Sequence, residues 1–315
     1  MPTTRRLFLL FIILLLSSSS LRALDEEQNI ADFLWQKTIR LSPPHRPKVA
    51  LVLGGGGARA LAHIGVLKVL IEEKIPVDMV VGTSVGALVG ALYSAGVPIE
   101  KIETIGETIK WDKITNLKTT SIISLLISEH LLSTQALEDF MNAAIEHKRF
   151  DQLNIPFVCV AADIMTGERI ILREGDVGLA ARASATIPGI FDPVEYRHRF
   201  LIDGGLVDNL PTDIAKLSDA DVTIAVSVTS DFSKNRISNV FMMLIQSLYI
   251  QGKLLENEKL QLADIVIRPN VQDITVVDLN RSRECIDAGV LAARRMVPQI
   301  KKYLIDRISD EDTFK

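Results

Sequence analysis

Ser84 is the residue of this chain whose neighbours best suit nucleophilic chemistry. It is the central residue of Gly82-Thr83-Ser84-Val85-Gly86, a G-x-S-x-G pattern. An apolar run precedes the pattern and a helical pattern follows it, which is the strand–turn–helix context of a nucleophile elbow. The flanking glycines remove side chains that would clash at a sharp turn, and the positive end of the following helix faces developing negative charge. The pattern therefore predicts an exposed, reactive Ser84.

A serine nucleophile needs a base, and the order of the histidines does not suit that role. None follows residue 198, whereas a Ser–acid–His order requires a late histidine; the five are His45, His63, His130, His147 and His198. A carboxylate is the alternative, because Asp203 ends the expected strand 199–202 and is followed by Gly204 and Gly205. An Asp-Gly turn without a catalytic role is common. Taken alone, this short segment leaves both interpretations open.

A glycine-rich loop follows the apolar run 49–53 and precedes a helical pattern. Bare backbone N–H groups at such a junction bind negative charge, either of a phosphate or of an oxyanion formed during a reaction. A P-loop requires Gly-Lys-Ser/Thr after the glycines, where this chain has Ala58 and Arg59. A dinucleotide-binding loop requires an acid at the end of the second strand, where this chain has the serine turn. The loop therefore favours an oxyanion.

Alternating strands and helices must position these groups. Strands are expected at residues 48–53, 77–81, 156–161, 169–173, 199–202, 221–228 and 264–268. Helices are expected at residues 58–73, 84–95, 134–146, 210–218, 238–262 and 282–304. This alternation predicts an α/β fold, with a central, mostly parallel sheet between two layers of helices in a three-layer α/β/α sandwich.

The glycine loop, the serine pattern and the Asp203-Gly204-Gly205 segment, in this order, resemble the patatin-like phospholipase family. The resemblance is close to the bacterial members and to the catalytic domain of neuropathy target esterase. Residues 182–194, RASATIPGIFDPV, resemble a loop that the family carries shortly before its catalytic aspartate. The likeness covers about residues 48–210 and continues more weakly to about 300. One residue departs from the pattern, because relatives usually have glycine where this chain has Ala60.

The resemblance implies a Ser–Asp dyad, with Ser84 as the nucleophile and Asp203 as the general base. It assigns the oxyanion hole to the loop Gly54, Gly55, Gly56, Gly57, Ala58 and Arg59, with the N–H groups of Gly55 to Gly57 as the expected donors. Gly82, Thr83, Val85 and Gly86 complete the elbow, and Gly204 and Gly205 complete the D-G-G motif. Arg59 is expected to orient the loop, to face a lipid phosphate, or to form a salt bridge at the start of the helix.

The implied reaction is two-step hydrolysis of acyl esters of membrane lipids through an acyl-enzyme, as in phospholipase A or lysophospholipase, without a metal or other cofactor. Two alternatives remain open: a lipid acyltransferase, which uses the same residues, and a non-catalytic, membrane-associated binding protein that retains the fold. The expected substrate is a phospholipid or lysophospholipid at a membrane surface. The pattern does not specify the oligomeric state.

The composition argues against nucleic-acid binding. The 315 residues are 48 % apolar and carry a net charge of −4, with no block of like charges. Such a chain suits one large α/β domain or two small ones. Cys159 and Cys285 both lie in apolar segments, which favours buried free thiols and leaves a disulfide as the alternative.

The N-terminus has the order of a secretory signal peptide. Arg5 and Arg6 precede the apolar run 7–16, and serines 17–20 lead to Ala23. We expect residues 1–23 to be removed on export to the periplasm or envelope, with retention as a membrane anchor as the alternative. Residues 24–47 are expected to form a helix and a connector, and residues 48–315 a catalytic domain with its motifs in 48–210.

Two segments have open interpretations. Residues 111–133 are the least regular part of the chain and are interpreted as a cover over the site or as an ordinary connecting loop. Residues 238–262 have apolar positions at helical spacing, which is typical of a core helix or of a surface that contacts lipid or a partner.

Overall fold

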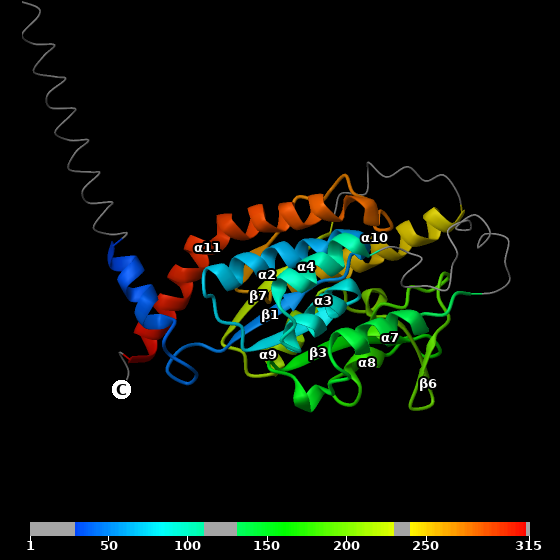
Figure 1. The fold of residues 1–315 in the computed structure, drawn as a ribbon, viewed down its shortest axis with the longest axis horizontal. Coiled ribbons are helices and arrows are strands. Elements are labelled where there is room, and N and C mark those ends of the chain that lie inside the picture. The colour runs from blue at the N-terminus through cyan, green and yellow to red at the C-terminus, as the bar shows by residue number, and fades with distance from the viewer. Residues whose placement is uncertain (1–28, 110–130, 230–239, 313–315) are drawn as a thin grey trace, which may run out of the picture. The chain divides into compact units, whose positions relative to one another are not determined.

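The computed structural model describes residues 29–109, 131–229 and 240–312 (Figure 1). Two compact units are present: Lys48–Val297, and Met1–Pro47 together with Pro298–Lys315. The larger unit begins where the catalytic domain was expected to begin, whereas the residues after Val297 group with the N-terminal segment. The expected signal peptide and residues 111–130 of the irregular segment lie outside the described residues.

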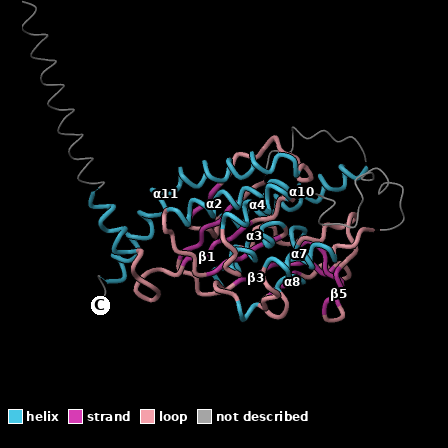
Figure 2. The backbone as a smooth tube through the Cα atoms, viewed as in Figure 1, coloured by secondary structure: helices cyan, strands magenta, loops and turns pink. Residues whose placement is uncertain are grey.

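An eight-stranded sheet forms the centre of the larger unit as far as it is described (Figure 2). Its strands are β1 Val49–Leu53, β2 Met79–Thr83, β3 Phe157–Asp163, β4 Arg169–Leu172, β5 Val194–Tyr196, β6 Arg199–Asp203, β7 Val222–Val226 and β8 Ile265–Ile267. Their order is β5-β6-β3-β2-β1-β7-β8, with β4 also paired to β3. The run from β3 to β8 is parallel, and β4, β5 and β6 pair antiparallel. The sheet is therefore mostly parallel, as the sequence predicts.

Helices cover both faces of the sheet. On one face Val52 and Val81 belong to a buried cluster with Ile214 of α9, Thr212–Leu217. On the other face lies α3, Val85–Ser94, where a Cβ added to Gly90 would be 2.9 Å from Val80 Cγ1. Neighbouring residues of a strand point to opposite faces, so the helices that pack on Val80 and Val81 lie on opposite sides. The predicted three layers are confirmed.

The helices largely follow the predicted pattern. The expected ones are present as η1 Gly57–Leu61 with α2 Ala62–Glu72, α3, α7 Gln135–Ala144, α9, α10 Val240–Leu260 and α11 Ser282–Asp312. Two further helices and one strand, α4 Ile99–Thr108, α8 Val177–Ser184 and β5, were not expected. Helix α4 buries only Ile102 and Gly106, so its apolar stripe is too narrow to stand out, and β5 has only three residues.

The remaining features of the fold concern the cysteines, the smaller unit and the helix lengths. Cys159 and Cys285 are buried free thiols, so the disulfide alternative is wrong. In the smaller unit residues 29–38 are helical, and Lys301 Nζ lies 5.4 Å from the ring centroid of Trp35. Among the helices described, none combines the length and the apolar character needed to cross a membrane.

Candidate active site

Ser84 occupies a strained turn between β2 and α3. Its backbone has φ 56° and ψ −130°, a conformation that residues with a Cβ rarely adopt. The turn requires glycine on both sides: a Cβ on Gly82 would lie 2.7 Å from Ala87 Cα, and one on Gly86 would overlap the carbonyl oxygen of Leu53. The strand, turn and helix that the sequence predicts around Ser84 are therefore present, with the strain typical of a nucleophile elbow.

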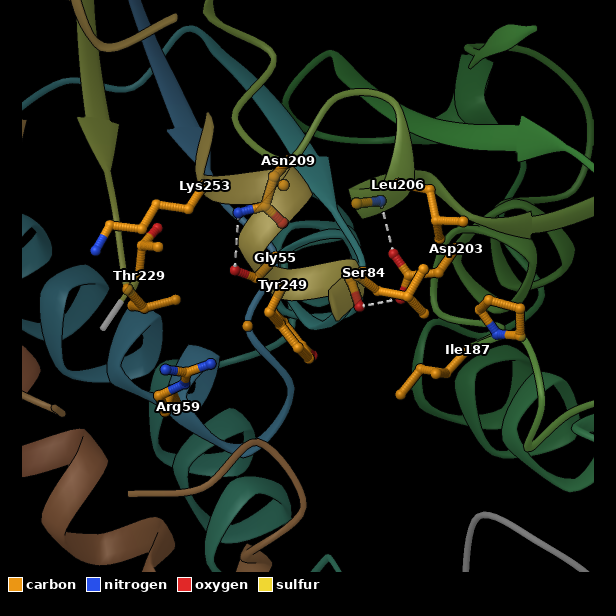
Figure 3. Close-up of a pocket in the computed structure, with 16 residues that line it drawn as sticks. Gly55, Arg59, Ser84, Ile187, Asp203, Leu206, Asn209, Thr229, Tyr249 and Lys253 are labelled. Atoms are coloured by element: carbon orange, nitrogen blue, oxygen red, sulfur yellow. Dashed lines mark hydrogen bonds between the residues drawn. The ribbon is translucent and has the colours of Figure 1, made fainter. Parts of the chain in front are cut away.

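Asp203 faces Ser84 from the end of β6. The Ser84 hydroxyl donates a hydrogen bond of 2.6 Å to Asp203 Oδ2, and the N–H of Gly205 donates one of 2.8 Å to Oδ1 (Figure 3). Both residues are buried, with exposed fractions of 4 % for Ser84 and 6 % for Asp203. The expectation of an exposed Ser84 is therefore wrong, because the serine lies in the wall of two pockets rather than at the open surface. Glycine is needed after the aspartate, because a Cβ on Gly204 would overlap the carbonyl oxygen of Val160. The Asp-Gly-Gly segment thus brings a carboxylate within hydrogen-bond reach of the serine.

Burial sets the basicity of this carboxyl group. Removal from water raises the pKa of Asp203 from 3.8 to about 6, and the hydrogen bonds from Ser84 and Gly205 limit the rise. A base works best when its pKa approaches the operating pH, so this shift improves Asp203 as a proton acceptor. Asp203 can therefore accept the hydroxyl proton of Ser84, as expected from the sequence.

The backbone N–H groups of the glycine loop are only partly available. The N–H of Gly54 donates to Val226 O at 3.1 Å, that of Gly55 to Asn209 O at 3.1 Å, and that of Ala58 to Val276 O at 2.7 Å. The expectation that Gly55 contributes an oxyanion donor therefore fails, because the fold uses its N–H. Within the described part of the chain, no acceptor bonds the N–H of Gly56 or Gly57. These two are the donors that remain.

Arg59 is buried beside the loop. It has an exposed fraction of 2 %, and its guanidinium carbon lies 5.4 Å from the ring centroid of Tyr249, over the aromatic face. Burial lowers the pKa of Arg59, and the electrostatic influence of Tyr249, Cys285 and Glu256 opposes that shift. This contact with Tyr249 of α10 was not among the roles expected for Arg59.

His63 contacts the glycine loop through a hydrogen bond to Gly54. It is fully buried, and its Nε2 donates to the carbonyl oxygen of Gly54 at 2.7 Å. Burial lowers the pKa of His63 to about 4, against the opposing effect of that hydrogen bond. The other described histidines, His45, His147 and His198, are exposed, and none of the four lines a pocket that contains Ser84. No described histidine is thus placed to deprotonate Ser84.

Two pockets meet at Ser84. The first, which we call the polar pocket because charged and amide side chains lie in its wall, is lined by Asp203 and Asn209 and by two cationic residues, Arg59 and Lys253 (Figure 3). Apolar residues such as Ile187, Leu206 and Leu248 complete its wall. The second, which we call the apolar pocket, has Ser84 as the one polar side chain among the described residues of its wall. A third pocket, lined wholly by apolar residues and glycine, shares five wall residues with the second, namely Leu61, Val85, Leu88, Ile109 and Leu137. The third pocket therefore adjoins the apolar pocket along α3, and we call it the extension of the apolar pocket.

Several residues around the site were not expected from the sequence. Ser184 Oγ accepts the N–H of Ser84 at 3.0 Å and donates to Val160 O at 2.6 Å, and Thr186 O accepts the N–H of Asp203 at 2.8 Å. Both lie in the 182–194 segment, so the resemblance had indicated the loop but not its contacts. This loop holds the backbone of both members of the Ser–Asp pair.

Helix α10 has two different faces, which the sequence left as alternatives. Tyr249 and Lys253 line the polar pocket, and Glu256 is buried with an exposed fraction of 2 %. Large apolar side chains of the same helix are exposed, with fractions of 57 % for Leu244 and 66 % for Leu254. The helix is therefore part of the site on one side and carries exposed apolar groups elsewhere.

The comparisons with known proteins agree with this geometry. Residues 51–216 match the family model described as patatin-like phospholipase. An uncharacterised NTE family protein of Mycobacterium tuberculosis is 35 % identical over 194 residues, which cover 60 % of this chain and 51 % of that protein. Human patatin-like phospholipase domain-containing protein 6 is 35 % identical over 185 residues, or 58 % of this chain and 13 % of the human protein. The chain thus spans about half the length of the mycobacterial relative and a smaller part of the human one.

A solved structure shows the same fold. Human GIVD cytosolic phospholipase A2, in complex with methyl γ-linolenyl fluorophosphonate and terbium chloride, aligns with a TM-score of 0.50 at 12 % sequence identity. The alignment covers 89 % of this chain and 63 % of the human chain. Because the family model covers more than half of the sequence and the elbow, aspartate and glycine loop lie together, this chain belongs to the patatin-like phospholipase family.

Proposed function

We propose that this chain is a serine acyl hydrolase of the phospholipase A or lysophospholipase type, acting through the Ser84–Asp203 dyad. The observation that carries the proposal is the hydrogen bond of 2.6 Å from the Ser84 hydroxyl to Asp203, at the point where the polar and apolar pockets meet. The family membership supports an ester of a lipid as the substrate.

The first half-reaction forms an acyl-enzyme. Asp203 takes the proton from Ser84 Oγ as that oxygen attacks the acyl carbonyl carbon, and the carbonyl oxygen becomes the oxyanion of a tetrahedral intermediate. The free N–H groups of Gly56 and Gly57 hold this oxyanion; removing one such donor typically costs about 10²–10³ in kcat. When the intermediate collapses, the bond to the alcohol breaks, and the alcohol leaves with the proton from Asp203.

The second half-reaction returns the free enzyme. Asp203 takes a proton from water, and the resulting hydroxide equivalent attacks the acyl-enzyme carbonyl. The second tetrahedral intermediate uses the same N–H donors, and its collapse releases the fatty acid and returns the proton to Ser84 Oγ. In both half-reactions, the groups that accept and return protons and bind the oxyanion belong to the chain itself.

The two pockets divide the substrate between them. The apolar pocket and its extension along α3 suit the acyl chain, because burying it there removes apolar surface from water without displacing polar partners. The polar pocket, with Arg59 and Lys253 in its wall, suits the alcohol and an anionic head group. This division supports a phospholipid or lysophospholipid as the substrate.

Lipid products test the proposal. The purified protein is incubated with phospholipids and lysophospholipids of defined head group, and free fatty acid and lysolipid are measured by mass spectrometry. We expect fatty acid release that depends on Ser84. Adding an acceptor lipid separates hydrolysis from acyl transfer, because a transferase moves the label to the acceptor. A protein that binds lipid but releases no fatty acid would refute the proposal.

We further propose that the protein works at a membrane surface after export. The N-terminal sequence pattern supports export with removal of residues 1–23. Exposed Leu244 and Leu254 on α10 support contact with lipid, since the same helix lines the polar pocket. Sequencing the N-terminus of the native protein tests removal, and a start at Met1 or Pro2 contradicts it. Vesicle co-sedimentation of Leu244→Glu and Leu254→Glu tests the surface, and unchanged binding contradicts it.

A further inference from the structure

Glu256 is a buried carboxylate that the reaction described above does not use. It lies in the C-terminal half of α10 and accepts hydrogen bonds from Asn209 Nδ2 at 2.8 Å and from the hydroxyl groups of Ser227 and Thr229. Ser227 and Thr229 follow β7, so the carboxylate joins the helix to the end of the sheet. Burying a carboxylate is costly unless its oxygens are bonded, so this set of donors gives Glu256 a defined position.

Asn209 connects Glu256 to the glycine loop. Its side-chain Nδ2 also donates to the carbonyl oxygen of Gly55 at 3.4 Å (Figure 3). The backbone carbonyl oxygen of Asn209 accepts the N–H of Gly55 at 3.1 Å. There is no room for a side chain between them, because a Cβ on Gly55 would lie 2.5 Å from Asn209 Oδ1 and 3.2 Å from Ser84 Cβ. Asn209 therefore holds both backbone polar groups of Gly55, which lies beside Ser84.

The orientation of the Gly55 carbonyl determines the direction of the next N–H. In a planar trans peptide the carbonyl oxygen and the following N–H point in opposite directions. Because Gly55 O is turned toward Asn209, the N–H of Gly56 points away from Asn209, and Gly56 lines the polar pocket beside Ser84. The N–H of Gly56 is also one of the two that the fold leaves available.

The carboxylate also determines which way the Asn209 amide faces. A carboxylate only accepts hydrogen bonds, so the NH₂ group of Asn209 must face Glu256, and its second hydrogen is then directed to Gly55 O. Without Glu256 the amide is free to turn over and present its oxygen to Gly55 O, which would repel that carbonyl. A negative charge on α10 thus controls a peptide that it does not touch.

We propose that Glu256 and Asn209 are positioning residues that hold the Gly55–Gly56 peptide with its N–H directed at the oxyanion. The inference rests on the proposed function, because it names how the oxyanion donors of that site are kept in place. The oxyanion exists only after attack, so the pair acts on the transition state rather than on the bound ester. Loss of the pair lowers kcat and leaves KM unchanged.

The experiment compares four variants with the wild-type full chain. Asn209→Ala and Glu256→Ala break the connection, Glu256→Gln keeps an oxygen that accepts from Asn209, and Lys259→Met is the matched control. Lys259 also anchors α10, through ion pairs of 2.6 Å with Asp213 and 3.3 Å with Asp208, but it does not line the polar pocket. Steady-state kinetics with one ester, the rate of fluorophosphonate labelling and the melting temperature are measured for each.

The expected pattern separates positioning from stability. For Asn209→Ala and Glu256→Ala, kcat falls by about 10- to 100-fold, which does not exceed the fall expected when one oxyanion donor is removed altogether. KM stays within about twofold of the wild-type value. Fluorophosphonate labelling slows in parallel, because the phosphoryl oxygen also gains negative charge during attack. Glu256→Gln recovers most of kcat, and Lys259→Met lowers the melting temperature with wild-type kcat.

Three outcomes would overturn the inference. If folded Asn209→Ala and Glu256→Ala keep kcat within about threefold of wild type, the pair does not position the donor. If Lys259→Met loses kcat to the same extent, the effect belongs to the anchoring of α10 in general. If the wild type shows no Ser84-dependent hydrolysis or labelling, the proposed function fails and this inference fails with it.

Discussion

The hydroxyl group of Ser84 and the carboxylate of Asp203 lie 2.6 Å apart, although the two residues are 119 positions apart in the chain. The serine is held in a strained turn and the aspartate at the end of a strand, so neither depends on a flexible loop for its position. Two buried groups in direct contact form a preorganised pair, which lowers the entropy that must be lost before proton transfer.

The first prediction concerns the nucleophile. Ser84→Ala removes the hydroxyl group that donates to the Asp203 carboxylate and should abolish both labelling by a fluorophosphonate probe and ester hydrolysis. Ser94→Ala is the matched control, since Ser94 is also a buried serine but is the last residue of α3, whereas Ser84 precedes the first. Labelling that persists in Ser84→Ala, detected by intact-protein mass spectrometry, would assign the nucleophile to another residue.

The second prediction compares the two candidate bases. Asp203→Asn should lower kcat by about 10²–10⁴, the usual cost of losing a well-placed base, because the amide has nearly the same shape. His63→Gln should change kcat by less than about tenfold, since the role of His63 is a hydrogen bond to Gly54 that glutamine can also donate. Thermal melts show whether both variants fold. The opposite ranking in two folded variants would exclude the Ser–Asp dyad.

The third prediction is the pH dependence of the reaction. A general base works in its deprotonated form, so kcat/KM should rise with pH up to the pKa of Asp203, about 6, and stay level above it. A His63 base would place the same rise near its lowered pKa of about 4. Rates measured between pH 4 and pH 8 with an uncharged ester distinguish them. A level profile down to pH 5 is incompatible with Asp203 as the base.

The fourth prediction links the same group to stability. The folded state raises the pKa of Asp203 from 3.8 to about 6, so it favours the protonated carboxyl, and its contribution is complete below pH 3.8 and lost as pH rises through 6. The loss amounts to about 2–3 kcal/mol, since one pKa unit is ~1.4 kcal/mol. Asp203→Asn does not titrate, so its free energy of unfolding relative to wild type should increase by that amount between pH 4 and pH 7.

Urea unfolding of both proteins at several pH values measures this difference. Denaturation of Asp203→Asn and wild type is compared at each pH, which removes the contribution of all other groups that titrate alike in the two proteins. A difference in unfolding free energy that is constant with pH would show that burial does not raise the pKa of Asp203.

The fifth prediction tests the apolar pocket as the acyl site. Leu137 of α7 lines both the apolar pocket and its extension, so Leu137→Trp should block the passage between them. Hydrolysis of long-chain esters should fall relative to that of butyryl esters, and overpacking should cost about 1–3 kcal/mol of stability. Leu217→Trp, at a side chain with an exposed fraction of 80 %, is the control. An unchanged ratio of long- to short-chain rates would place the acyl chain elsewhere.

The sequence by itself determined the local features of this protein. Glycine is required wherever the backbone of the elbow passes close to another chain segment, so the G-x-S-x-G pattern around Ser84 reports a local steric need that can be read directly. The periodicity of apolar residues likewise indicated the buried strands and the longer helices. Elements with a weak local signal, such as β5 and α4, were not expected, because three residues or a narrow apolar stripe leave too little pattern.

Only the tertiary structure decided which groups meet and which remain free. The N–H of Gly55 was expected to be an oxyanion donor, and it is instead bonded to Asn209, a partner 154 residues away. The roles of Tyr249 and Glu256 depend on α10 crossing the site, where a Cβ on Gly252 would lie 3.1 Å from Gly205 O. Such contacts arise from the packing of distant elements, and local sequence records the shape of an element but not the partner that it will bury.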